Sequence, residues 1–106
     1  MHAVAVHTNQ IAFRNDVFRR SGFGIVLTQG IQELPDVVPL LEAVRRFDKF
    51  TKDNDPHQEH DFGTIQWGCE KVFWKIDYYD QALEMWEDPL SAKCRRVLTV
   101  MLAEEY

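Results

Sequence analysis

The segment from residue 61 to residue 79 constrains the fold most, because it has the pattern of a β-hairpin. Gly68-Cys69 suits a two-residue turn with glycine at its first central position. Opposed residues on paired strands keep a constant sum of residue numbers, so this turn fixes the register. The expected pairs are Trp67 with Glu70, Ile65 with Val72, Gly63 with Trp74 and, if pairing continues, His60 with Asp77. One face then carries the core residues Ile65, Val72, Trp74 and Ile76, and the other carries Phe62, Thr64, Phe73 and Lys75.

Apolar spacing and chain breakers predict the elements before the hairpin. Residues 8–20 are predicted to form a helix that ends at Gly22, with Arg14, Arg19 and Arg20 toward solvent. Residues 23–28 are rich in β-branched side chains and predict a short strand. Residues 35–50 repeat apolar side chains at helical spacing, and the polar residues 51–60 predict a loop.

Two segments follow the hairpin. Residues 80–87 fit either a helical turn or an ordered loop, with Leu83 and Trp86 as the expected anchors of the segment. Asp88-Pro89 is typical of a helix start, with Asp88 as N-cap, and the apolar residues from Val97 to Leu102 predict that this helix runs toward the C-terminus. We therefore expect one α+β domain over residues 1–106. Its predicted order is αβαββα, with a small antiparallel sheet of about three strands packed by three helices.

Composition narrows the classes of function. Seventeen acidic against twelve basic residues give a formal charge of −5, which argues against direct binding of nucleic acid. The first residues lack the basic start of a leader, and no apolar run is long enough to cross a membrane, so we expect a cytoplasmic protein. Cys69 and Cys94 lack the paired spacing of a zinc framework. The sequence contains neither GxxxxGK[ST] nor GxGxxG, the glycine-rich motifs that bind phosphate groups, and we predict no cofactor.

Histidines and carboxylates gather in and beside the predicted loop. His57, His60 and Asp61 are candidate ligands for a metal, although their spacing matches no known metal motif. If the hairpin register extends to His60, Asp77 lies beside it and can orient the imidazole ring, as in half of a catalytic dyad. The alternative is a solvated loop whose Asp and His side chains cap nearby backbone groups.

Aromatic and acidic residues gather after the hairpin. Alternation assigns Trp74 and Tyr78 to the core, which leaves Tyr79 and Trp86 as surface anchors. The candidate binding residues are Tyr79, Trp86, Asp80, Glu84 and Glu87. Aromatic anchors among carboxylates are typical of a surface that binds a basic protein partner, but single exposed aromatic residues are also common.

Several segments together resemble one family. They are Asn54-Asp55-Pro56, the residues from Glu59 to Gly63, the residues from Val72 to Asp80, and the residues from Arg96 to Tyr106. Phe18-Arg19-Arg20 and the residues from Val26 to Ile31 match as well. Together they resemble the bacterial domain-of-unknown-function family numbered 3768. The resemblance implies no activity and no catalytic residues, but it implies a bacterial setting, often on plasmids and other mobile elements.

Two hypotheses of function follow. The first is a non-enzymatic protein-interaction module, an accessory or inhibitor protein of a mobile element that binds a bacterial host or defence complex of the anti-restriction or anti-CRISPR type. It would act through Tyr79, Trp86 and the neighbouring carboxylates. The second is a metal-dependent or general-base hydrolase that uses His57, His60, Asp61 and Asp77.

Overall fold

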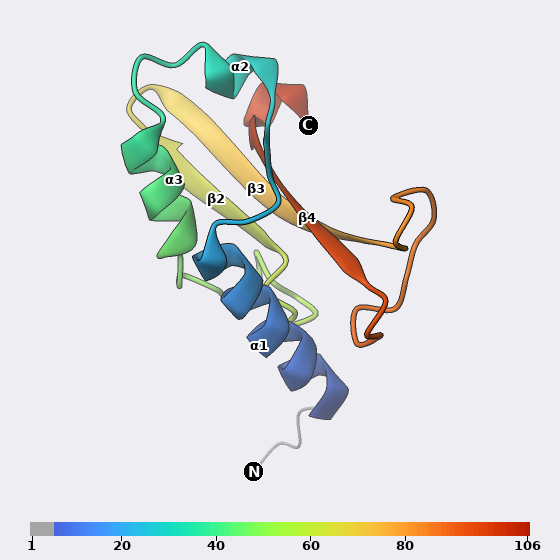
Figure 1. Cartoon of the computed structure of the whole chain (residues 1–106). Coiled ribbons are helices and arrows are strands. Elements are labelled where there is room, and N and C mark those ends of the chain that lie inside the picture. Colours follow the sequence, from blue (N-terminus) through green and yellow to red (C-terminus); the bar gives the residue numbers. More distant parts are fainter. Residues whose placement is uncertain (1–5) are drawn as a thin grey trace.

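A computed structural model of the chain describes residues 6–106, with side chains from residue 10 onward (Figure 1). The expectation about a leader rests in part on residues 1–5, which lie outside this part. In chain order the elements are α1 (Val6–Ser21), β1 (Ile25–Leu27), α2 (Gln29–Gln32), α3 (Val38–Arg45), β2 (Phe62–Trp67), β3 (Glu70–Tyr79), β4 (Arg95–Leu102) and the 3₁₀ helix η1 (Ala103–Glu105). The α+β class is confirmed. No helix in residues 6–106 is long and apolar enough to cross a bilayer.

The predicted hairpin is confirmed in its turn and its register. Gly68 has a φ of 61°, the left-handed conformation that the turn requires of its first central residue. Ile65 pairs with Val72 and Gly63 pairs with Trp74, as expected. The pairing within β2 ends at Phe62, however, and does not continue to His60.

The helix predicted from residue 88 to the C-terminus is wrong, because Arg95–Leu102 form the strand β4. Asp88 caps only a local turn, in which its carboxylate accepts a hydrogen bond from the backbone N–H of Leu90. β4 lies between β1 and β3 in a sheet of order β1-β4-β3-β2, parallel to β1 and antiparallel to β3. The predicted antiparallel sheet of about three strands is therefore corrected to a mixed sheet of four.

The helices before the sheet follow the predicted segments in part. The helix expected over residues 8–20 is α1, and the one expected over residues 35–50 is the shorter α3, whose second residue is Pro39. Proline is tolerated there because the first helical N–H groups have no partner within the helix. The short helix α2 was not predicted. The strand expected over residues 23–28 is the three-residue β1.

One face of the sheet forms the core with the helices. Val72, Trp74 and Ile76 of β3 alternate with more exposed residues and point to the same side as Leu98 and Val100 of β4. Burial brings these side chains together with Ile31 of α2 and with Leu40 and Val44 of α3. Figure 1 shows α1 and α3 beside each other across this face of the sheet. Apolar burial on this one face is the main stabilising contribution of the fold.

The C-terminal residues pack at the end of the sheet where β4 ends. The carboxylate of Glu105 accepts hydrogen bonds from the Thr28 hydroxyl at 2.6 Å and from the backbone N–H groups of Gly30 and Leu102 at 2.9 Å. These bonds lower the pKa of the Glu105 carboxyl below its ordinary value. Tyr106 then lies against Phe73, with ring centroids 5.8 Å apart.

Candidate functional sites

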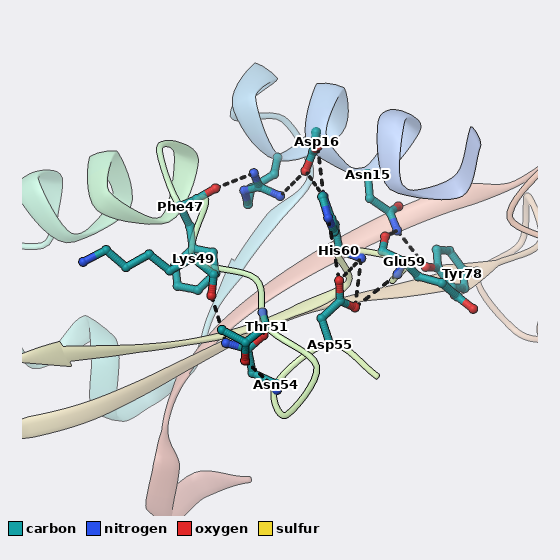
Figure 2. Close-up of polar contacts among 11 residues, drawn as sticks. Asn15, Asp16, Phe47, Lys49, Thr51, Asn54, Asp55, Glu59, His60 and Tyr78 are labelled. Atoms are coloured by element: carbon teal, nitrogen blue, oxygen red, sulfur yellow. Dashed lines mark hydrogen bonds and ion pairs between the residues drawn. The ribbon is translucent and has the colours of Figure 1, made fainter. Parts of the chain in front are cut away.

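His60 lies against α1 and not against β3. Its Nδ1 atom is 3.0 Å from both carboxylate oxygens of Asp16, and its Nε2 atom is 3.7 Å from a carboxylate oxygen of Asp55 (Figure 2). The ring also stacks on Phe50, with centroids 3.8 Å apart and planes within 3° of parallel. The imidazole is thus held between the first helix and the loop that precedes β2.

The loop conformation directs the His60 ring to this position. His60 has a φ of 57°, so the backbone is not extended at this residue, and β2 begins only at Phe62. The buried carboxylate of Asp55 accepts hydrogen bonds from the backbone N–H groups of Glu59 and His60 at 3.1 and 3.2 Å. Asp55 therefore closes the loop through its side chain, in the way expected of an aspartate that caps backbone donors.

The predicted pairing of His60 with Asp77 is wrong. Asp77 pairs with Lys75 on the opposite face of the hairpin, with 2.7 Å between the Lys75 ammonium nitrogen and a carboxylate oxygen. The prediction extended the strand pairing from Phe62 to His60, but the pairing ends at Phe62 because His60 has a positive φ. His57 is exposed on the loop.

Asp61 contributes to a different contact. Its carboxylate accepts a 3.3 Å hydrogen bond from the Tyr78 hydroxyl, and burial raises the pKa of the Asp61 carboxyl above its ordinary value. Among residues with described side chains, no three His, Cys, Asp or Glu come together as a group that could hold a metal ion. His57, His60 and Asp61 therefore do not meet as a ligand set in this part of the chain.

Asn15 connects α1 with the sheet and the loop. Its side chain is fully buried, and its Nδ2 atom donates to the Glu59 carbonyl at 2.9 Å and to the Tyr78 hydroxyl at 2.8 Å. Its Oδ1 atom accepts a 2.6 Å hydrogen bond from Nε of Arg96. The Arg96 guanidinium lies over the Tyr78 ring, 5.3 Å from its centroid. A buried polar side chain with all these partners stabilises one arrangement of helix, strand and loop.

Arg19 is buried, contrary to the prediction that it faces solvent. Its guanidinium donates to Asp16 at 3.0 Å and to the Phe47 carbonyl at 2.8 Å, and it lies 4.9 Å from the centroid of Trp74. Burial lowers the pKa of Arg19. Arg14 and Arg20 of the same helix are exposed, so the residue type did not mark Arg19 as the buried arginine.

These contacts make Asp16 and His60 a structural clamp. Asp16 contacts both the buried Arg19 and the His60 ring, so it joins the two halves of the cluster. Both ring nitrogens of His60 face carboxylates, and one ring face is covered by Phe50. A cavity of about 320 Å³ lies beside the ring. A general base needs a nitrogen within reach of substrate, whereas here both nitrogens are directed at protein groups.

A second candidate site is the loop between β3 and β4. Three large apolar side chains are exposed on it: Leu83 at 43%, Met85 at 69% and Trp86 at 71%. Figure 1 shows that this loop projects beyond the sheet. The sequence predicted Trp86 as a surface anchor and named Leu83 with Trp86 as the anchors of this segment, but it did not single out Met85.

The other predicted binding residues border this loop. Tyr79 is half-buried at the end of β3, where it pairs with Arg95. The Asp80 carboxylate accepts a hydrogen bond from the backbone N–H of Glu84, and that of Glu87 accepts one from the next residue, so both help to hold the loop. The Glu84 side chain is exposed.

Comparison with known proteins places the chain in a family. The family model described as "Protein of unknown function (DUF3768)" matches residues 27–105, which is most of the chain. The chain belongs to this family. The matched region includes the hairpin, β4 and the 80–87 loop, and α1 lies outside it. No curated protein and no solved structure matches the chain.

Proposed function

We propose that this member of the family is a non-enzymatic protein-interaction module whose binding surface is the loop of residues 80–87. The observation that carries the proposal is the exposure of Leu83, Met85 and Trp86 together on one short segment. The hydration of exposed large apolar side chains is unfavourable, so burying them against a partner lowers the free energy, and such patches are typical of interaction sites. Tryptophan is among the residues most enriched at the energetic centres of interfaces.

The loop is held in shape by its own backbone. The N–H of Asp80 donates to the Met85 carbonyl at 2.8 Å, and the N–H of Leu83 donates to the Asp80 carbonyl at 3.0 Å. Trp86 forms an isolated antiparallel bridge with Tyr79. A preformed loop pays less conformational entropy on binding, which makes the apolar contacts more effective.

The charge beside the loop selects the partner. Asp80, Glu84 and Glu87 are interspersed with the apolar residues along the loop, and the whole chain has a formal charge of −5. Carboxylates around an apolar centre favour a partner with a basic surface and suppress acidic ones. We take that partner to be a protein of a bacterial host or of its defence systems, the setting that the family resemblance implies, so that the module acts as an accessory or inhibitor by covering a surface.

The hydrolase alternative keeps only part of its predicted residues. His60 does have a carboxylate partner, but that partner is Asp16 on α1 and not Asp77. The described side chains include no group of three metal ligands, and each imidazole nitrogen of His60 lies within 3.7 Å of a carboxylate oxygen of the chain itself. The interaction module is therefore the function that the geometry supports best.

Affinity capture with the purified chain tests this proposal. Tagged wild-type protein, the Trp86→Ala variant and the Val38→Ala variant are each incubated with bacterial lysate at low and high salt. Val38 is a matched control because it is 70% exposed but lies on α3. We expect one stoichiometric partner with wild type and with Val38→Ala, lost with Trp86→Ala and weakened by salt. Equal capture by all three proteins, or no partner at all, would refute the proposal.

A further inference from the structure

A second apolar surface lies at the same end of the sheet as the 80–87 loop. It is a groove of about 610 Å³ between α1, the segment that leads into β1, and the start of β4. Phe13 and Val17 of α1 and Phe23 before β1 line it, and these three side chains are 69%, 52% and 77% exposed. Such exposure of large apolar residues on a small chain indicates a surface that another molecule covers.

The charges in the groove differ in sign from those of the whole chain. Among the described side chains, the charged residues that line it are Arg14, Arg95 and Arg96, and none is acidic. Arg96 is held inward by Asn15, whereas the exposed Arg14 and Arg95 donate to the neutral backbone carbonyls of Leu90 and Gln81. On a chain with a formal charge of −5, this groove is therefore locally basic and apolar. Charge complementarity favours an occupant that is apolar and acidic.

The chain itself carries a segment with these properties. The 80–87 loop combines Leu83, Met85 and Trp86 with the exposed carboxylate of Glu84. We propose that the loop of one copy binds in the α1–β4 groove of a second copy, so that the chain forms a homodimer. This inference rests on the proposed function, because it names the partner of the same loop.

The positions of loop and groove permit a reciprocal exchange. Tyr79, which precedes the loop, pairs with Arg95, which lines the groove, so both surfaces lie at the same end of the sheet. A two-fold axis beyond that end places each loop against the other copy's groove, as a closed dimer requires. The loop does not cover its own groove, because Trp86 is 71% exposed and the loop projects away from the sheet (Figure 1).

The expected dimer is reversible and sensitive to salt. Each copy contributes three apolar side chains from the loop and three from the groove. We therefore expect the dimer to bury a surface area at the lower end of the range for specific interfaces. Arg14, Arg95 and the Glu84 carboxylate are solvent-exposed, so salt screens their attraction.

Sedimentation velocity of the full chain over a range of concentrations tests this inference. We expect a monomer–dimer equilibrium for wild type and for Val38→Ala. Trp86→Ala in the loop and Phe23→Ala in the groove are each expected to weaken dimerisation by about tenfold or more. Circular dichroism melts verify that each variant is folded.

Charge exchange distinguishes the proposed contact from other dimers. Glu84→Lys and Arg14→Glu are each expected to weaken dimerisation, and mixing these two variants, or combining both changes in one chain, is expected to restore it. A wild-type monomer at all concentrations overturns the inference, as does a dimer that is indifferent to Trp86→Ala and Phe23→Ala. If the chain is monomeric but Trp86-dependent capture of a host protein persists, the proposed function stands and the homodimer fails. If the dimer forms and no host protein is captured, the homodimer stands and the proposed host partner fails.

Discussion

Replacing Asn15 by alanine tests the buried network that joins α1 to the sheet. The side chain makes three hydrogen bonds, two as a donor to the Glu59 carbonyl and the Tyr78 hydroxyl and one as an acceptor from Arg96. A neutral hydrogen bond contributes about 1 kcal/mol to stability, and one to a charged group contributes about 1.5 to 3 kcal/mol. The three together correspond to roughly 4 kcal/mol, because the partners of Asn15 stay in place without it.

Chemical and thermal denaturation measure this loss. Roughly 4 kcal/mol corresponds to a fall in the melting temperature of about 16 °C or more for a chain of this size. Gln10→Ala is the matched control, since Gln10 lies on the same helix and is exposed; we expect it to change stability by less than about 0.5 kcal/mol. A loss below about 1 kcal/mol for Asn15→Ala would show that the network does not hold the helix in place.

Three further substitutions test other parts of the structure. Burial raises the pKa of Asp61 in the folded protein above its ordinary 3.8, so the stability that the protonated carboxyl provides is lost as the pH rises through the folded pKa. In urea denaturation, the stability of Asp61→Asn relative to wild type should therefore be greater near neutral pH than below pH 3.8. Hydrogen bonds lower the folded pKa of Glu105, so its contribution is present above 4.5 and is lost as the pH falls through the folded pKa; Glu105→Gln should lower the melting temperature only at the higher pH. An alanine Cβ at Gly63 would lie 2.3 Å from Nε1 of the buried Trp74. Gly63→Ala should therefore lower the free energy of unfolding by about 2 kcal/mol in chemical denaturation. Adding Trp74→Phe to the same chain should recover part of this loss, because it removes the indole nitrogen from the contact.

The hairpin was predictable because its information is local. Gly68-Cys69 fixes the turn, and alternation along β3 fixes which side chains enter the core. The strand β4 was not predictable in this way. It lies between two other strands, and Met101 and Leu102 are both buried, so its apolar residues run together and fit a helical period as well as an alternating one. Only the pairing with β1 and β3 decides between them.

The candidate sites show the same limit. Trp86 was predictable as a surface anchor, because it stands outside any core pattern. The partner of His60 was not, because Asp16 is 44 residues away on a helix whose packing the sequence does not specify. The burial of Arg19 has the same cause, since a single helix pattern does not show which of its arginines the neighbouring Phe47 carbonyl and Trp74 ring will receive.

Photo-cross-linking from the 80–87 loop tests whether this loop is the surface that binds another protein. A photoreactive phenylalanine analogue replaces Met85 in one sample and Val38 in another, both exposed positions, and the proteins are irradiated in bacterial cells. We expect a discrete protein adduct from the loop position and none from the α3 position, with a mass that distinguishes a second copy of the chain from a host protein. No adduct from the loop, or equal yields from both positions, would contradict the claim that this loop is the binding surface.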